Sequence, residues 1–274
     1  MTSLVAWVGV DSRRPSSIYF ASDSRISWPD GYAWDYGRKL FASRTQPDIL
    51  GYSGDVAFPS HTLGQIVDLI DAGLLIADED APTVRLERIL SVIRNAFETY
   101  PPFQKRPFSI VYGTREYAHM KSNFSVACIS WAPDRQWIVD WMELPRESGI
   151  IRVFGSGERA VEKWYSRWHR TSESRTSRSV FSAFCDALGS GDDALSGGAP
   201  QLVRLYRIGR GQDIGVIWKE KCFTCGLPVT ESANLERLEW RNRVFERCDW
   251  RTKGALQEAQ RHRRPSGLGR IGEN

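Results

Sequence analysis

The sequence predicts an α+β fold in which two β-sheets are stacked between two layers of helices, a four-layer αββα sandwich. Segments with strand composition and segments with helical periodicity are grouped in the order strands, two helices, strands, two helices, strands. They do not alternate one by one, as they would in a parallel doubly wound sheet. The chain of 274 residues is long enough for a full hydrophobic core, so we expect one main domain with a short C-terminal appendage.

Runs of β-branched and aromatic residues, separated by turns rich in Asp, Pro and Gly, predict the strands. Residues 4–10 and 17–21 form the first hairpin, because a polar turn with Pro15 separates them. The remaining strands are expected at residues 50–53, 108–112, 124–131, 137–144, 150–154, 202–208 and 214–218. Apolar residues at helical spacing predict helices at residues 66–74, 83–100, 159–168 and 177–188.

Composition excludes several classes of protein. The formal net charge is only +4, and much of the excess lies in the tail at Arg261, Arg263 and Arg264, so we expect no nucleic-acid partner for the body. The start of the chain lacks the pattern of a signal peptide and no apolar run reaches 18 residues, which predicts a cytoplasmic protein without a membrane partner. Five cysteines, an odd number with irregular spacing, predict reduced thiols and no disulfide framework.

Thr2 is the first candidate for chemistry. A small second residue permits removal of Met1, which would give Thr2 a free α-amine. Such an amine titrates at about 7.7 to 8.0 in model peptides, where a general base is effective. One residue then supplies both a hydroxyl nucleophile and its base. A threonine at this position is otherwise an ordinary start of a strand.

Charged residues on two later segments are candidate partners of that amine. Asp23 and Arg25 end the second expected strand on one face, because side chains alternate with period two. Lys39 follows in the segment Gly-Arg-Lys-Leu-Phe. A cation beside the amine would keep it unprotonated, and Asp23 would hold that cation. Taken separately, these residues are also explained as surface ion pairs.

Together with three glycine-containing segments, these residues resemble the pattern of the proteasome β-type subunits. This family of N-terminal-nucleophile threonine peptidases includes the bacterial two-component peptidase and its relatives. The resemblance extends from Thr2 to about Trp218. Its matching segments are Ala-Ser-Asp-Ser-Arg at 21–25, Arg-Lys at 38–39, Gly-Tyr-Ser-Gly-Asp at 51–55, Gly-Ser-Gly at 155–157 and Asp-Ala-Leu-Ser-Gly-Gly at 193–198.

The resemblance implies a domain over residues 1–219 with the N-terminal-nucleophile hydrolase fold and threonine endopeptidase activity without a cofactor. In the implied site Thr2 is nucleophile and base, and Asp23 and Lys39 tune its reactivity. Three further side chains would form the hydrogen-bonded support around the amine, namely Ser156, Asp193 and Ser196.

The resemblance also implies where the substrate lies. The backbone amide of Gly54 or Asp55 would donate to the oxyanion, since a turn into a helix offers unpaired N–H groups. Asp55 departs from the family, which usually has a second glycine there. The positions that correspond to the specificity pocket are Ile26, Gly37, Ser53 and Ala57. Because these residues are mostly small, we expect an open pocket that accepts a large side chain.

The partners implied by the resemblance are a peptide or unfolded protein substrate, further copies of the chain in a homo-oligomer or ring, and an ATP-dependent unfoldase or regulatory partner. Three alternatives stay open. The same fold also suits an amidohydrolase of small molecules, and a non-catalytic ring subunit would retain Met1. The Gly-Ser-Gly segment at 155–157 also suits a phosphate cradle, but it lacks a third glycine and a crossover pattern.

Residues 220–274 form an extension beyond the resemblance. Cys222 and Cys225 have the spacing of half a zinc site, but only Cys248 and His262 remain downstream, at spacings of no standard zinc ribbon. We therefore expect a strand with reduced thiols and no metal. A partly apolar face predicts a helix over residues 234–248 that docks on the core or on a neighbouring subunit, followed by a basic flexible tail.

Overall fold

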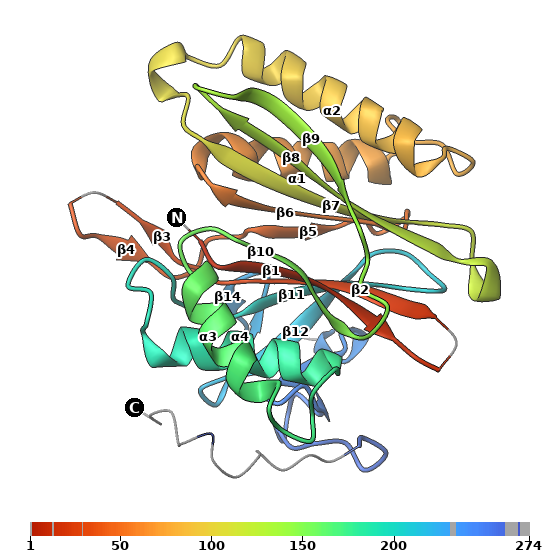
Figure 1. Cartoon of the computed structure of the whole chain (residues 1–274), viewed down its shortest axis with the longest axis vertical. Coiled ribbons are helices and arrows are strands. Elements are labelled where there is room, and N and C mark those ends of the chain that lie inside the picture. The colour runs from red at the N-terminus through yellow and green to blue at the C-terminus, as the bar shows by residue number, and fades with distance from the viewer. Residues whose placement is uncertain (1, 13, 29, 231–233, 261–267, 269–274) are drawn as a thin grey trace.

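The computed structural model describes residues 2–12, 14–28, 30–230, 234–260 and 268, and it has mixed α+β architecture (Figure 1). Within these residues the strands form two large sheets and one separate hairpin. The expected α+β class is confirmed, because helices and strands are segregated along the chain in the expected order.

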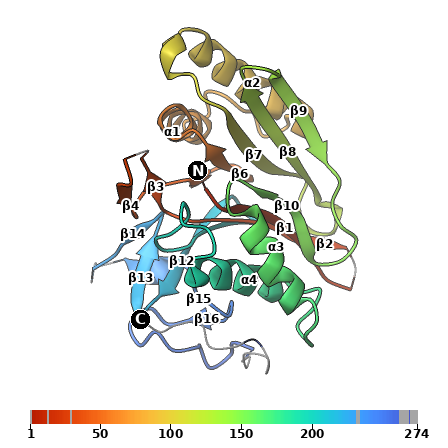
Figure 2. The same ribbon diagram turned by 60° about the vertical axis from the view of Figure 1, so that its left-hand side comes forward.

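The smaller sheet has five antiparallel strands in sequence order, which consecutive hairpins and one helical connection produce. The strands are β5 (Leu40–Ala42), β6 (Asp48–Gly54), β7 (Phe108–Glu116), β8 (Asn123–Ala132) and β9 (Gln136–Met142). Helices α1 (Ala57–Asp71) and α2 (Pro82–Glu98) connect β6 to β7 and pack their apolar faces on this sheet. In Figures 1 and 2 they lie at the top of the molecule.

The larger sheet has β10 at one edge and contains both the first strand and the extension, in the order β10-β1-β2-β11-β12-β13-β14. Its strands are β1 (Leu4–Val10), β2 (Pro15–Ser22), β10 (Gly149–Phe154), β11 (Gln201–Tyr206), β12 (Gln212–Trp218), β13 (Lys221–Thr224), β14 (Leu227–Pro228), β15 (Trp240–Asn242) and β16 (Arg247–Cys248). Helices α3 (Glu158–Trp168) and α4 (Ser177–Ser190) pack on the face turned away from the five-stranded sheet (Figure 2). The short 3-10 helices are η1 (Pro102–Gln104), η2 (His119–Lys121) and η3 (Leu235–Arg237).

Strand β1 shows why the two sheets stack. Its side chains alternate between two buried surfaces, so the strand reads as a continuous apolar run. Leu4, Ala6 and Val8 pack against the five-stranded sheet, whereas Val5 and Trp7 pack against α3 and α4. Burial on both sides fixes the register of β1, because a shift by one residue would exchange the two sets of side chains.

A two-stranded hairpin, β3 (Ile26–Ser27) and β4 (Ala33–Trp34), projects from the body (Figure 1). Its aromatic side chains are largely exposed, at 49% for Trp28, 75% for Tyr32 and 47% for Trp34. The sequence pattern predicted no hairpin here, because each strand has only two residues and alternation cannot be read over so short a run.

The prediction of a helix over residues 234–248 is wrong. The segment forms η3, β15 and β16 instead, and β15 runs parallel to β12. Tertiary contacts override the helical spacing, since Trp240 is buried over Gly215 and the Asn242 side chain accepts hydrogen bonds from the amides of Val244 and Glu246. The expected basic tail at Arg261, His262, Arg263 and Arg264 lies outside the described residues.

All five cysteines are free thiols. In the extension, Cys222 contacts the carbonyl of Trp250, Cys225 contacts Asp213, and Cys248 contacts the carbonyl of Glu246. Over the part of the chain that the structure describes, no group of three or more His, Cys, Asp or Glu residues is placed to hold a metal ion. No helix of the described part is long and apolar enough to cross a membrane.

Candidate active site

Thr2 lies two residues before the start of β1, which pairs with β2 on one side and β10 on the other. The residue is fully buried, and its Oγ1 atom has no hydrogen-bond partner among the described residues. Gly155 contacts its backbone so closely that a Cβ atom on Gly155 would lie 1.9 Å from the Thr2 carbonyl oxygen. Only glycine fits there, and its φ of +89° also favours glycine.

A buried ion pair between Lys39 and Asp23 is bonded to the backbone of Ser3, the residue after Thr2. The Lys39 Nζ atom is 2.7 Å from Asp23 Oδ1, and both side chains have an exposed fraction of 0%. The same Asp23 oxygen accepts a hydrogen bond of 3.1 Å from the Ser3 amide, so the pair is anchored to the backbone next to Thr2. Lys39 Nζ also donates to the carbonyl oxygen of Arg25 at 2.6 Å.

Burial shifts the pKa of both members of this pair. It lowers the pKa of Lys39, and the attraction of Asp23 opposes this effect. It raises the pKa of Asp23, against the opposing effect of Lys39 and of the amides of Gly197 and Ser3. The pKa of each group therefore depends on the charge of the other.

A chain of hydroxyls and one carboxylate forms the other half of the site. The Asp193 Oδ2 atom accepts hydrogen bonds from Ser196 at 2.6 Å and from Ser156 at 2.8 Å. The Ser196 hydroxyl is in turn 2.7 Å from that of Ser3. A Cβ on Gly157 would lie 1.6 Å from Ser3 Oγ, so glycine is needed for this chain to close. The structure therefore brings all three expected support residues next to the start of β1.

The segment expected to hold the oxyanion lies where β6 leads into α1. The Asp55 amide donates to the carbonyl of Pro107 at 2.9 Å and is therefore already engaged. The Asp55 carboxylate accepts from the amide of Phe58 at 3.2 Å, which places this charge at the start of α1. Gly54 has a φ of +94°, and a Cβ there would lie 2.6 Å from the Pro107 carbonyl oxygen. Of the two expected donors, the Asp55 amide is thus occupied in this structure.

The four residues expected to line the specificity pocket lie in two separate segments, Ile26 with Gly37 and Ser53 with Ala57. Ile26 packs over Gly37, where a Cβ would lie 2.6 Å from the Ile26 Cδ1 atom. Ser53 is buried at the end of β6, and Ala57 is exposed at the start of α1.

Sequence reasoning missed Gln201 and undervalued Arg25. The Gln201 side chain accepts from the Lys39 amide at 3.0 Å and donates to the carbonyls of Asp23 and Gly37. Arg25 forms a bidentate ion pair with Asp35. Gln201 on β11 pairs with Ser22 on the neighbouring strand β2, so only the pairing of these two strands could have shown that Gln201 lies next to the site.

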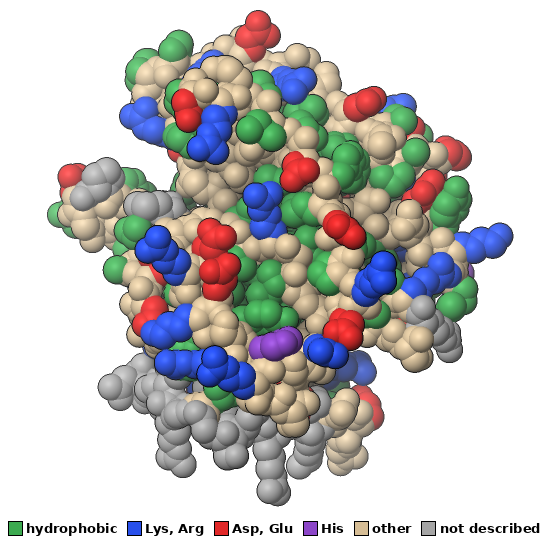
Figure 3. Space-filling model, viewed as in Figure 1, with side chains coloured by type: hydrophobic (Ala, Val, Ile, Leu, Met, Phe, Trp, Pro, Cys, Tyr) green, Lys and Arg blue, Asp and Glu red, His purple; other side chains and the backbone are tan. Residues whose placement is uncertain are grey.

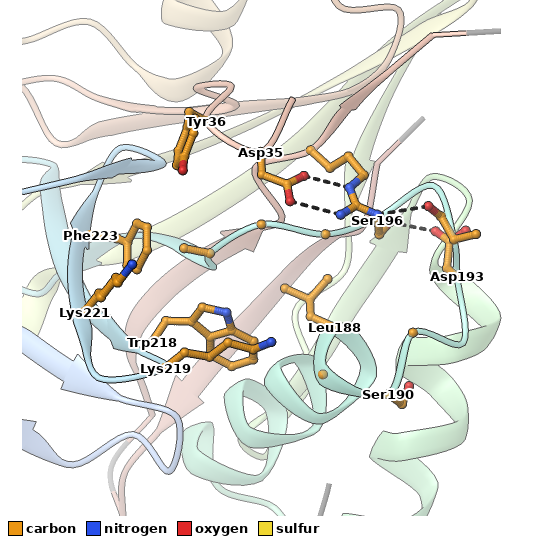
Figure 4. A pocket seen from close by; sticks show the side chains of 17 residues that line it. Asp35, Tyr36, Leu188, Ser190, Asp193, Ser196, Trp218, Lys219, Lys221 and Phe223 are labelled. Carbon is orange, nitrogen blue, oxygen red and sulfur yellow. Dashed lines mark hydrogen bonds and ion pairs between the residues drawn. The ribbon is translucent and has the colours of Figure 1, made fainter. Parts of the chain in front are cut away.

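Asp193 and Ser196 also line a cavity of about 560 Å³ (Figure 4). Figure 4 shows Trp218, Lys219 and Phe223 across this cavity from Asp193. Its walls come from segments far apart in the sequence, so no local pattern predicted it. The cavity gives the Asp193 end of the network a route to the surface.

Neither a family model nor a curated sequence matches this chain. Among solved structures, the chain is similar to eukaryotic HslV from Trypanosoma brucei, with 12% sequence identity and a TM-score of 0.45. The match covers 74% of this chain and 99% of that chain. A likeness at this distance assigns neither family nor activity, so the functional argument depends on the geometry of the chain's own residues.

Proposed function

We propose that this chain is a threonine-type endopeptidase whose nucleophile is Thr2, on a four-layer αββα sandwich of the N-terminal-nucleophile hydrolase type. The observation that carries the proposal is the surroundings of Thr2. Its buried hydroxyl has no partner among the described residues, and a buried Asp23–Lys39 pair is bonded to the next amide of the chain. An unpartnered buried hydroxyl costs stability, and its position next to a residue that is bonded to a buried ion pair supports a role in chemistry.

In the proposed mechanism, Met1 is first removed, which leaves the α-amine of Thr2 free. The amine accepts the hydroxyl proton while Thr2 Oγ1 attacks the carbonyl carbon of the peptide bond. The amide of Gly54 donates to the oxyanion. The C–N bond then breaks, the leaving amine takes the proton, and an ester on Thr2 remains. Water hydrolyses this ester, which releases the acid and restores the hydroxyl.

The other residues hold the amine and its charge state. In this mechanism Lys39, held in place by Asp23, acts as a cation that disfavours protonation of the amine. Asp193 accepts from Ser156 and Ser196, and the Ser196 hydroxyl also contacts that of Ser3, the residue after Thr2. With this support the amine is positioned before substrate arrives, which lowers the cost of reaching the transition state.

We propose peptides or unfolded protein segments as substrates, bound with the acyl side over Ile26, Gly37, Ser53 and Ala57. Homo-oligomeric assembly, cytoplasmic location and an ATP-dependent unfoldase or regulatory partner belong to the same proposal. They follow from the sequence resemblance alone.

Mass spectrometry after treatment with a peptide epoxyketone tests the proposal, because this electrophile reacts with a hydroxyl and an amine on one residue. We expect the mass of a chain without Met1 plus one inhibitor, with the adduct on Thr2. Thr2→Ala keeps a small second residue and should be processed but not labelled. Thr83→Ala, at an exposed threonine, is the matched control and should label normally. Retention of Met1, or labelling of Thr2→Ala, would overturn the assignment.

A further inference from the structure

We propose that Gln201 is a positioning residue of the Thr2 site, whose carboxamide fixes the backbone of Lys39 and of Gly37. Gln201 is the first residue of β11, and only 2% of its surface is exposed. It acts through the residues that it bonds and takes no part in the reaction itself. This inference rests on the proposed function, because it concerns how the cation of that site is held.

The carboxamide of Gln201 is bonded at both of its polar atoms. Its Oε1 atom accepts a hydrogen bond from the Lys39 amide at 3.0 Å. Its Nε2 atom donates to the carbonyls of Gly37 at 2.8 Å and Asp23 at 3.1 Å, and it also lies 3.1 Å from Ser24 Oγ. A carboxamide supplies an acceptor on one side and donors on the other, whereas an ionised carboxylate has only acceptors and an apolar side chain has neither.

The bond from the Lys39 amide to Gln201 joins the two sheets at the site. Lys39 immediately precedes β5 of the five-stranded sheet, whereas Gln201 lies on β11 of the larger sheet. The Lys39 carbonyl accepts from the Tyr52 amide at 3.2 Å, so Gln201 and Tyr52 hold the two sides of its backbone. At the other end of the side chain, Nζ donates to Asp23 and to the carbonyl of Arg25. Because a lysine side chain is a flexible four-carbon stem, the position of Nζ depends on both ends being held.

The charge of Lys39 lies inside the molecule, where its position matters most. Figure 3 shows Lys, Arg, Asp and Glu side chains spread over one face of the molecule, whereas the side chains of Lys39 and Asp23 are fully buried. Water and salt screen a buried charge only weakly, so its effect on a neighbouring amine changes strongly with distance. In the proposed mechanism, a small displacement of Lys39 Nζ therefore changes the charge state of the Thr2 amine.

The bond to the Gly37 carbonyl connects the same carboxamide to the expected specificity pocket. Gly37 packs against Ile26, so a shift of its backbone moves a wall of that pocket. The Gly37 amide donates to the Ser24 carbonyl at 2.9 Å, and Gln201 holds the other side of the residue. One side chain thus fixes both the cation and a pocket wall, and its loss should affect kcat and KM together.

A buried glutamine that pairs backbone groups also stabilises a fold without any role in chemistry. Removal of the Gln201 carboxamide leaves the Lys39 amide and the carbonyls of Asp23 and Gly37 without this partner, which costs stability. Lower stability alone therefore does not identify a positioning residue. The rate at which Thr2 reacts in each folded chain does so, because this rate depends on the geometry of the site.

Epoxyketone labelling at saturating inhibitor measures this rate, and hydrolysis of a fluorogenic peptide measures kcat and KM. For Gln201→Met we expect the labelling rate and kcat to fall by about tenfold or more and KM to rise, while each folded chain still binds one inhibitor. Gln212→Met is the matched control, because it removes a carboxamide that bonds Arg204 on the neighbouring strand. Ile93→Ala is the control for lost stability, since Ile93 is fully buried in the core between α2 and the five-stranded sheet. Both controls should label at the unaltered rate.

Gln201→Glu decides the question if Gln201→Met does not fold. It keeps the length of the side chain and an acceptor for the Lys39 amide, but even a protonated carboxyl donates only one hydrogen bond. We expect its labelling rate to lie between those of Gln201→Met and the unaltered protein. Labelling of the folded Met variant at the unaltered rate, or of the Glu variant where the Met variant does not fold, would show that Gln201 is only structural. If the unaltered protein is not labelled at Thr2, the proposed function fails first, and the positioning role fails with it.

Discussion

At the scale of single residues, the Asp23–Lys39 pair is the most informative feature of the molecule. Both charges are fully buried, and taking them out of water costs free energy that their attraction only partly offsets. A pair of apolar residues would therefore stabilise the fold at least as well. In the proposed function the pair has a chemical role near the hydroxyl of Thr2, which has no hydrogen-bond partner among the described residues.

Lys39→Met separates the structural from the chemical role of the pair. The variant leaves the Asp23 carboxylate buried without its cation, which should cost about 3 to 5 kcal/mol of unfolding free energy. A double variant that also carries Asp23→Asn has no unpaired buried charge at this site, so it should recover part of the lost unfolding free energy. We expect epoxyketone labelling of Thr2 to stay slow in both variants. Urea unfolding and labelling rates check this, and labelling of the double variant at the unaltered rate would mean that the pair is only structural.

Sequence reasoning named several residues that the structure brings together, but it did not predict the contacts between them. Asp23 and Lys39 belong to short motifs of fixed spacing, and in the structure they form an ion pair that is bonded to the amide of Ser3. Gln201 and Ser3 join the site through sheet register and side-chain contacts. No local pattern encodes such contacts, because they depend on how distant strands align.

At the scale of elements, periodicity located every helix and long strand that positions the site. It was less exact at element ends, since α1 begins at Ala57, whereas the apolar spacing had suggested residues 66–74. Leu74, expected on its apolar face, lies beyond the helix and is 75% exposed. The ends depend on capping contacts such as that of Asp55 with the Phe58 amide, which hydrophobic periodicity does not report.

Arg85 fixes α2 to the five-stranded sheet. Its guanidinium lies 2.7 Å from Asp48 on β6, and both side chains are buried. Tyr112 on β7 donates to the other oxygen of Asp48. Burial raises the pKa of Asp48, and the charge of Arg85 opposes this effect. The charge of Arg85 is thus the largest effect that favours the ionised carboxylate, and hydrogen bonds from Tyr112 and Thr114 add to it.

We predict that Arg85→Met costs about 3 to 5 kcal/mol of unfolding free energy at pH 7.5, since it leaves a buried charge unpaired. Without the cation the Asp48 pKa rises further, so the folded state binds a proton that the unfolded state releases above about pH 4. Stability should then fall as pH rises, and lowering the pH to about 5 should restore part of the loss. Urea unfolding at the two pH values measures both effects.

Arg88→Met on the same helix is the control for Arg85→Met. Arg88 pairs with Asp80 at 3.2 Å but is about half exposed, so its removal should cost no more than about 1 kcal/mol. A loss for Arg85→Met that is equally small, or independent of pH, would show that Asp48 is stable without its partner.

At the scale of the whole molecule, the C-terminal extension supports the candidate site. It continues the larger sheet through β13 and adds β15 in parallel to β12. Its turn at Gly226 lies against the site, because a Cβ there would be 3.0 Å from the Gly37 carbonyl oxygen and from Ser24 Oγ. Ser24 is the neighbour of Asp23 in the chain, so a displacement of the extension would be transmitted through Ser24 to the Asp23–Lys39 ion pair.

The contact of Trp240 with Gly215 is the place to test this coupling. A Cβ on Gly215 would lie 2.3 Å from the Trp240 ring, so Gly215→Ala alone should displace β15 and destabilise the protein. Trp240→Ala alone should cost about 3 to 5 kcal/mol, because it leaves a cavity over β12. In the double variant the new methyl group occupies part of that cavity, so the combined loss should be smaller than the sum of the two. Urea unfolding of the four proteins measures the coupling, with exposed Trp28→Ala as the control that should change little. Additive losses, or a separate early transition for the extension, would mean that it folds independently of the sheet that holds Thr2.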